Sequence, residues 1–335
     1  MEQAIQQQDA LARHWKRLYA PIAAELAAAE ELLRGELTSE HPFVDALVKH
    51  AFRLGGKRLR PALVLLAAKA VGKLTRDAIV LAAVVEMIHT ATLVHDDVLD
   101  EASLRRHRET INARSDNEAS VLVGDFLFTH AFYLASSLET TFACQTIGRA
   151  TNIVCAGELR QIHSRGNYAL SEIEYLDIIA AKTAELCACC CRLGAHYGGG
   201  TPQCEDALDR FGRNLGIAFQ IADDMLDLVG DETSMGKSLG TDLQKQKPTL
   251  PVIRLLAEST PRQRAETIEL LSSSNHKQAR EQLSIHLERS DALQYTRQKA
   301  QSFADAAKED LRQLPAGQAR DVLVALTELV VSRQD

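Results

Sequence analysis

The sequence predicts an all-α protein, and three of its features support this prediction. Among 335 residues there are only 18 glycines and 8 prolines, and aromatic residues make up just 5% of the chain. Alanine, leucine and glutamate, which favour helices, recur throughout. Apolar residues also recur at helical spacing, first in residues 22–37 and then in residues 41–53. We therefore expect helices to build the whole fold.

The overall composition limits both the organisation and the function of the chain. With 46% hydrophobic and 25% charged residues it can bury a sizeable core. No linker or low-complexity segment interrupts it, so we expect residues 1–335 to form a single domain. The formal net charge of −7 argues against a nucleic-acid-binding protein, whose surface would be basic.

The longest apolar stretch, residues 78–94, contains Glu86 and His89. Both side chains would be costly inside a bilayer, so we expect a buried helix there and no transmembrane segment. The N-terminal residues lack the apolar centre of a secretory signal. Seven cysteines, an odd number without an export signal, indicate a reducing compartment. We therefore expect a cytoplasmic protein.

Four of the cysteines are crowded into residues 187–191. On a helix Cys187 and Cys191 share a face, whereas Cys189 and Cys190 project elsewhere, so the four cannot easily bind one metal ion. We interpret them as small buried residues rather than a zinc site.

An acidic cluster ends the apolar stretch. Asp96 and Asp100 are spaced i and i+4 on a helix, with Asp97 beside the first, and like charges on one helix face repel each other unless a cation lies between them. Magnesium prefers oxygen ligands and is usually held by one or two carboxylates together with substrate phosphates. A single cluster of this kind is more often a solvated helix face than a metal site.

A second cluster with the same spacing makes the metal site the better interpretation. Asp223, Asp224 and Asp227 end another apolar helical run. Two such clusters suggest two helices that face each other across one cavity, with metal ions between them.

Cationic side chains accompany both clusters. Lys57 and Arg60 lie in a glycine-led loop before a helix that begins with Pro61, and a helix N-terminus favours anions. A solvated basic loop is the alternative. His89 lies two helical turns before Asp96 and could donate a hydrogen bond to a phosphate, although a lone histidine is more often a core residue. The remaining candidate cations are Arg105, Arg106, Lys182, Lys237 and Lys247.

Six carboxylates surrounded by cations predict a diphosphate-binding site, and the helices around them are apolar. The implied ligand has a diphosphate head and a hydrocarbon tail. Metal ions and cations that neutralise a departing diphosphate lower the barrier to breaking its carbon–oxygen bond. An allylic cation would remain, and a dry cavity must protect it until a carbon nucleophile arrives.

Over nearly its whole length the chain resembles the trans-isoprenyl diphosphate synthases. The resemblance is carried by GGKRLRP, HDDVLDEASLRR, the pair Lys182–Thr183, FQIADDMLD and GKSLGTD, in the order and spacing of that family. It implies an all-α isoprenoid synthase bundle around a central cavity, commonly a homodimer. It also implies a prenyltransferase that joins an allylic diphosphate to isopentenyl diphosphate head to tail, with transient membrane contact for product release.

The resemblance assigns a role to each candidate residue. The six aspartates Asp96, Asp97, Asp100, Asp223, Asp224 and Asp227 would hold magnesium, about three ions per site. Arg105, Lys182 and Lys237 would bind the allylic diphosphate. Isopentenyl diphosphate would be bound by Lys57, Arg60, His89 and Arg106. Thr183 and Gln220 would flank the reacting carbons, and Lys247 would lie near the metal-bound diphosphate.

Two positions depart from the family pattern. His107 stands where the family usually has a glycine after the paired arginines, and Gln246 stands where it usually has a glycine before the last lysine. Both could alter loop closure, but neither removes a ligand.

Three alternatives share this chemistry in part. A terpene cyclase usually replaces the second aspartate cluster with an asparagine–serine–glutamate motif, which is not present here. A silent regulatory subunit typically loses one cluster, and this chain keeps both. A short-chain farnesyl or geranylgeranyl diphosphate synthase differs mainly in product length.

The residues just before Asp96 bear on that length, because a tail that grows away from the metals must run between the helices. Ala91 and Thr92 lie where the resemblance places an aromatic plug in short-chain enzymes. One helical turn rises about 5.4 Å, close to one isoprene unit, so an open path predicts an all-trans product longer than about twenty carbons, as in quinone side chains. Met87 lies deeper on the same face, and Phe128 and Phe132 are candidate floors.

Overall fold

The computed structural model describes residues 15–53, 56–106, 108–230, 240–273 and 275–332. The first 14 residues, His107 and Lys237 lie outside these ranges. Within them the regular secondary structure is helical apart from one short antiparallel pair of strands, β1 (Leu104–Arg105) and β2 (Arg108–Glu109). The all-α prediction is confirmed.

The chain forms two compact units. The first contains residues 1–148, 189–209 and 313–323, and the second contains residues 149–188, 210–312 and 324–335. The single domain expected over residues 1–335 stays a prediction. The first unit begins with η1 (Ala20–Ile22), α2 (Ala23–Glu36), α3 (Pro42–Arg53), α4 (Leu59–Val71), α5 (Arg76–Leu99), α6 (Ile111–Arg114) and α7 (Asn117–Ser136).

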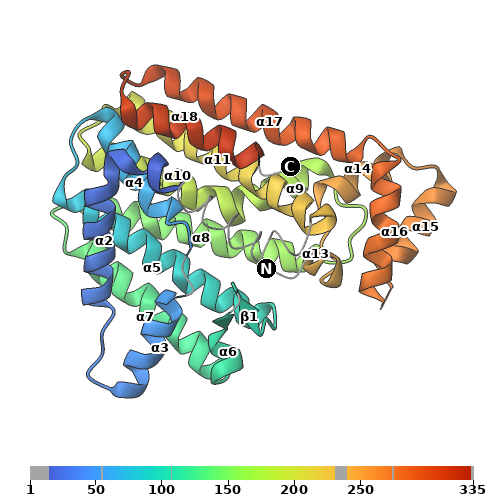
Figure 1. The fold of residues 1–335 in the computed structure, drawn as a ribbon, viewed down its shortest axis with the longest axis horizontal. Coiled ribbons are helices and arrows are strands. Elements are labelled where there is room, and N and C mark those ends of the chain that lie inside the picture. The colour runs from blue at the N-terminus through green and yellow to red at the C-terminus, as the bar shows by residue number, and fades with distance from the viewer. Residues whose placement is uncertain (1–14, 54–55, 107, 231–239, 274, 333–335) are drawn as a thin grey trace. The chain divides into compact units, whose positions relative to one another are not determined.

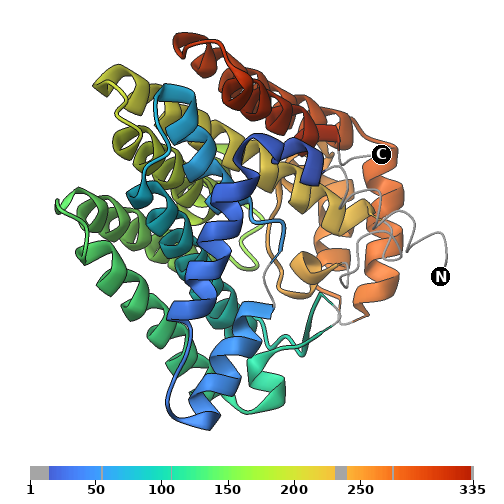
Figure 2. The same cartoon turned by 60° about the vertical axis from the view of Figure 1, so that its left-hand side comes forward.

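Helix α5 is central to the first unit and packs against α2, α4 and α7 (Figures 1 and 2). The Thr75 hydroxyl caps its start by accepting the Ala78 N–H at 3.2 Å. Every residue from 81 to 88 is buried. By length and composition α5 and α7 could each cross a membrane, but 67% of the apolar window of α5 is buried inside the protein. The buried helix expected over residues 78–94 is therefore present.

Four helices contribute residues to both units: α8 (Phe142–His163), α10 (Glu185–Tyr197), α11 (Pro202–Val229) and α18 (Gln318–Val331). The second unit also contains α9 (Glu172–Ile179), the π-helical turn η2 (Ala180–Ala184), α13 (Thr241–Gln244), α14 (Leu250–Glu258), α15 (Pro261–Leu271), α16 (His276–Glu288) and α17 (Ala292–Asp310). The short η3 (Leu311–Gln313) follows α17.

Two apolar clusters stabilise the second unit. One joins α14, α15 and α16, the orange helices of Figure 1, through side chains such as Leu255, Leu271 and Leu283. The other joins α9 to α11 through Ile178 and Ile221. Burial of apolar surface of this kind contributes about 25 cal/mol per Å². The second cluster borders the polar groups of α11.

Glycines let α11 approach α10 and η2 closely. A Cβ atom on Gly216 would lie 2.5 Å from the Ala184 Cα atom, and one on Gly212 would lie 2.6 Å from the Cys187 carbonyl oxygen. The four crowded cysteines are buried and form no disulfide. Among the described residues no three or more His, Cys, Asp or Glu side chains are grouped as in a preformed metal site. The interpretation of these cysteines as small buried residues agrees with their positions.

We expect Gly216→Ala to destabilise the protein by about 1–3 kcal/mol, because the new methyl group meets backbone and neither helix can move aside cheaply. Gly35→Ala is the matched control, since a Cβ there meets nothing within 4 Å and alanine favours the helix by about 0.5–1 kcal/mol. Thermal denaturation of both variants would measure the difference. A Gly216→Ala protein as stable as wild type would contradict the close approach.

Candidate active site

The first aspartate cluster lies at the C-terminal end of α5. Asp97 is buried, and its Oδ1 atom accepts hydrogen bonds of 2.8 Å from both Nε and Nη2 of Arg105. Asp96 and Asp100 are partly exposed. The Asp100 N–H donates to the Asp96 carbonyl oxygen at 2.7 Å and closes the last turn of the helix. The middle aspartate is therefore held by Arg105.

A buried ion pair anchors the basic loop beside α5. Arg58 adopts a left-handed conformation at the N-cap of α4, with φ of 52°. Its guanidinium group donates to Glu86 at 2.5 Å and to Glu30 at 3.1 Å. Burial raises the pKa of Glu86, against the lowering effect of Arg58. A Cβ atom on Gly56 would overlap the guanidinium group of Arg106, so the glycine leaves room for that cation.

His89 lies one turn after Glu86 on α5. Its Nδ1 atom and the Nε atom of Arg60 are buried and have no hydrogen-bond partner among the described residues. Burial, reinforced by Arg60 and Arg106, holds the pKa of His89 well below its usual value of 6.5. The imidazole is therefore neutral at neutral pH. Buried donors without partners beside several cations fit an anionic ligand.

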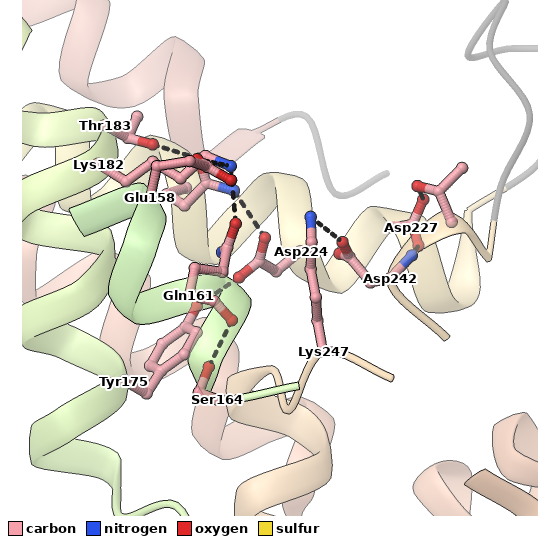
Figure 3. Close-up of polar contacts among 12 residues, drawn as sticks. Glu158, Gln161, Ser164, Tyr175, Lys182, Thr183, Asp224, Asp227, Asp242 and Lys247 are labelled. Atoms are coloured by element: carbon pink, nitrogen blue, oxygen red, sulfur yellow. Dashed lines mark hydrogen bonds and ion pairs between the residues drawn. The ribbon is translucent and has the colours of Figure 1, made fainter. Parts of the chain in front are cut away.

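The second aspartate cluster begins a chain of hydrogen bonds in the second unit (Figure 3). Asp224 is buried and accepts the Tyr175 hydroxyl at 2.7 Å and the Gln220 amide at 2.6 Å. The Thr183 hydroxyl donates to Gln220 at 2.7 Å. Burial, with the nearby Asp242 carboxylate, raises the pKa of Asp224 to about 7. Asp223, by contrast, is partly exposed.

Asp227 holds the segment that follows α11. Its Oδ1 atom accepts the Thr241 hydroxyl at 3.1 Å, and its Oδ2 atom accepts the Asp242 N–H at 2.9 Å at the start of α13. Asp242 in turn pairs with Lys247 at 3.0 Å. Burial alone would lower the pKa of Lys247, but Asp242, together with Asp224 and Glu158, raises it above its usual value.

Lys182 lies in the π-helical turn η2, a distortion that often occurs at functional sites. Its Nζ atom contacts the Glu158 carboxylate at 2.5 Å and donates to the Gln161 side-chain oxygen at 2.7 Å, and both partners lie on α8 (Figure 3). A Cβ atom on Gly157 would lie 2.7 Å from the Lys182 backbone nitrogen. The glycine therefore lets α8 approach η2 closely enough for these contacts.

Gln246 has a φ of 52°, in the left-handed region that favours glycine. Its carbonyl oxygen accepts the Gly166 N–H at 2.8 Å. The glutamine thus adopts the backbone conformation that a glycine at this position would adopt more easily, immediately before Lys247.

Comparison with known proteins decides the family. The model of the polyprenyl synthetase family matches residues 41–286. The chain belongs to this family. It is 36% identical to the octaprenyl diphosphate synthase of Escherichia coli (strain K12), over 93% of this chain and 96% of the relative. It is 37% identical to the all-trans-nonaprenyl-diphosphate synthase (geranyl-diphosphate specific) of Rhodobacter capsulatus, over 94% and 97%.

Solved structures of polyprenyl synthetases have the same fold. A decaprenyl diphosphate synthase from Rhodobacter capsulatus superposes with a TM-score of 0.89 at 36% identity, covering 96% of this chain and 99% of the other. A polyprenyl synthase from Caulobacter crescentus CB15, complexed with calcium and isoprenyl diphosphate, gives 0.89 at 38% identity, covering 96% and 98%. The recognition of this family from the sequence motifs is confirmed.

Each unit brings several of the predicted site residues close together, and the roles assigned to them stay predictions. The first unit places Arg60, His89 and Arg106 near Glu86, because all three influence one another or that carboxylate electrostatically. The second unit joins Thr183, Gln220 and Asp224 directly. Lys237 lies outside the described residues, and the placement of one aspartate cluster against the other stays a prediction.

Several residues of the site were not identified from the sequence. Tyr175, Glu158, Gln161 and Asp242 all contact predicted site residues. The i, i+3 spacing of Glu158 and Gln161 after a helical glycine was a signal, but only the register of α8 against η2 gives it meaning.

Three of the predicted chain-length residues lie on α5, where Ala91 and Met87 are buried and Thr92 is half-buried, and two lie on α7. Ala91 and Met87 are 1% and 0% exposed, and the Thr92 hydroxyl donates to the His89 carbonyl oxygen at 2.8 Å. The rings of Phe128 and Phe132 are 5.2 Å apart. Their role in setting product length stays a prediction.

We expect the free energy of unfolding to fall as pH is lowered below 6.5, and to fall less in His89→Gln. Because the folded state lowers the pKa of His89, the unfolded chain binds a proton at a pH where the folded protein does not. Acid therefore favours unfolding over the window below 6.5. Denaturant titrations of both proteins at pH 7.5 and pH 5.5 would isolate the contribution of His89. Parallel losses in the two proteins would contradict its burial as a neutral imidazole.

Proposed function

We propose that this chain is an all-trans polyprenyl diphosphate synthase, which adds isopentenyl diphosphate to an allylic diphosphate in successive head-to-tail steps. One observation carries the proposal: each aspartate cluster lies in a unit that also supplies cations able to bind a diphosphate. The octaprenyl and nonaprenyl diphosphate synthases among the relatives favour a product longer than about twenty carbons. An open path beside α5 favours the same length, because each helical turn admits about one isoprene unit.

The first unit supplies the proposed site for isopentenyl diphosphate. Lys57, Arg60 and Arg106 provide positive charge, and neutral His89 provides a hydrogen bond without adding to the repulsion among the cations. The buried Glu86–Arg58 pair holds the loop that carries Lys57 and Arg60. A diphosphate there satisfies the buried nitrogen atoms of Arg60 and His89.

The second unit supplies much of the proposed site for the allylic diphosphate. Lys182 and Lys247 provide positive charge from η2 and from the segment after α13, and the family resemblance assigns Arg105 and Lys237 to the same ligand. The hydrogen-bonded pair Thr183–Gln220 would flank the reacting carbons. These polar groups border the apolar cluster of α9 and α11, which fits a ligand with a charged head and an apolar tail.

The donor set fits magnesium bound together with diphosphate. Magnesium keeps waters and phosphate oxygens and needs only one or two protein carboxylates per ion. The six aspartates would supply these carboxylates: Asp96, Asp100 and Asp223 are partly exposed, and Asp97, Asp224 and Asp227 are buried. When bound, about three ions would neutralise the charge of the departing diphosphate.

The protein groups then act on the substrates around that chemistry. The allylic carbon–oxygen bond breaks, and its electrons leave with the diphosphate, whose charge Arg105, Lys182 and Lys247 stabilise. The double bond of isopentenyl diphosphate attacks the allylic cation, and loss of one proton restores the neutral product tail. Buried residues of α5 such as Met87 exclude water from the growing tail.

We also infer a cytoplasmic homodimer that contacts a membrane transiently as product leaves. Helix α7 supports the dimer, because Val121, Leu122 and Tyr133 expose 43%, 67% and 67% of their surface. An exposed apolar face of this kind fits a second copy of the chain.

The purified chain tests the activity directly. Incubation with magnesium, an allylic diphosphate and labelled isopentenyl diphosphate should give extractable polyprenyl products that chromatography resolves by length. Chelation of magnesium should abolish them. A purified chain that releases no diphosphate from both substrates would exclude the proposed function.

Asp96→Ala and Asp223→Ala should each lower kcat roughly 10³-fold while the protein stays folded, because these carboxylates would bind metal and do not belong to the hydrophobic core. Asp177→Ala, a change of an exposed aspartate in the second unit, is the control. Steady-state kinetics and circular dichroism would measure both effects. Retention of more than about a tenth of wild-type activity, or roughly 1.4 kcal/mol in the barrier, would reject the metal assignment.

Ala91→Phe should shorten the product with little loss of the first condensation, because the ring would block the tail below the metals. Ala91 is buried, so circular dichroism must confirm folding, and Ala91→Leu is a milder second variant. Phe132→Ala should lengthen the product if that ring forms the floor. Chromatography of the extracted products decides the matter, and an unchanged length in folded Ala91→Phe would refute the open path.

A further inference from the structure

Glu158 has a mostly buried carboxylate that plays no part in the proposed function. It lies on α8 in the second unit, and only 18% of its side chain is exposed. Its Oε2 atom forms an ion pair with the Nζ atom of Lys182 at 2.5 Å. An acid here is unexpected, because the function requires Lys182 to attract an anionic substrate.

The contact is built into the local fold. Gly157 removes the side chain that would otherwise separate α8 from η2, and the next residue, Glu158, then reaches Lys182. The π-helical turn displaces Lys182 from regular helical geometry. Gln161, one turn later on α8, accepts a second hydrogen bond from the same Nζ atom (Figure 3). Two α8 side chains thus engage one cation.

The same carboxylate also acts on a second cation of the site. Glu158 is among the groups that raise the pKa of Lys247, after Asp242 and Asp224. Lys247 already has its own partner in Asp242 at 3.0 Å. Glu158 therefore acts mainly on Lys182, and on Lys247 to a lesser extent.

A half-buried lysine needs a counter-anion when no substrate is bound, because an unpaired ammonium group out of water is costly. Glu158 supplies this anion. A diphosphate that approaches Lys182 brings several negative charges within a few ångströms of the carboxylate, and repulsion at that distance is strong where water is limited. Carboxylate and diphosphate therefore compete for the same ammonium group.

We propose that the Glu158 carboxylate pairs with Lys182 in the substrate-free protein, and that a bound diphosphate displaces this carboxylate from Lys182. Glu158 is then a positioning residue that acts through Lys182, and it sets how tightly the site retains the diphosphate that is released in every cycle. The inference rests on the proposed function, since it assumes that Lys182 binds diphosphate.

Glu158→Gln tests this exchange, because the amide keeps the shape and removes the charge. Calorimetric titration with inorganic diphosphate and magnesium should give a Kd roughly three- to tenfold lower than for wild type. The KM for the allylic diphosphate should fall while the KM for isopentenyl diphosphate stays unchanged, a split that a merely structural change would not produce. Unchanged or weaker diphosphate binding would overturn the proposal, and weaker binding would make Glu158 a support of the bound state.

Further variants sharpen the result. Glu172→Gln is the matched control, since Glu172 pairs with Lys299 at 2.7 Å in the same unit, and it should leave diphosphate affinity unchanged. In a Lys182→Met background Glu158→Gln should lose most of its effect, because the coupling runs through Lys182. Glu158→Asp keeps the charge but shortens its reach, so it should shift the affinity in the same direction by less; it also serves if Glu158→Gln fails to fold.

The outcomes separate this inference from the activity itself. A wild-type protein that makes polyprenyl products but shows no affinity change in folded Glu158→Gln would overturn the exchange alone. If the wild-type protein makes no product but Glu158→Gln binds inorganic diphosphate more tightly than wild type, the proposed function would be overturned. The displacement of Glu158 from Lys182 by diphosphate would still hold.

Discussion

The structure depends on one constraint: charges concentrated among apolar helices must be balanced inside the protein. Three of the candidate site residues have an internal partner of opposite charge. Asp97 is paired with Arg105, Lys182 with Glu158, and Lys247 with Asp242. Such pairs contribute little net stability, because their attraction mainly offsets the desolvation of both charges. Their value lies in holding the side chains in defined positions before any diphosphate arrives.

Close helix packing makes these pairs possible. Lys182 and Glu158 meet only because Gly157 removes a side chain between α8 and η2. Gly216 lets α11 approach Ala184 closely. Gln220, one turn after Gly216 on α11, then reaches the Thr183 hydroxyl. Small residues therefore shape the candidate site by letting its helices approach each other. The site would lose its geometry through a methyl group added far from the chemistry.

The sequence predicted those features that follow from local spacing. The helical class, the burial of residues 78–94 and the aspartate clusters could all be read from periodicity within a few turns. The contact between Tyr175 and Asp224 could not, because it joins residues on separate helices and depends on their register. The capping of α13 by Asp227 was missed for the same reason. At Gln246 the family pattern indicated an unusual position, and the left-handed backbone supplies the physical reason.

Internal pairing also explains why the substrate-free site does not resemble a ready metal cage. Asp224 and Asp227 direct their oxygen atoms to protein donors, and burial raises the pKa of Asp224 to about 7. A carboxylate with such a pKa needs a nearby cation to stay ionised at neutral pH. Magnesium–diphosphate would supply that charge, so binding of metal and ionisation of Asp224 favour each other. The same argument applies to the lysines, which exchange one anion for another. Substrate binding is therefore a rearrangement of existing charge pairs, and its free energy is the difference between two well-paired states.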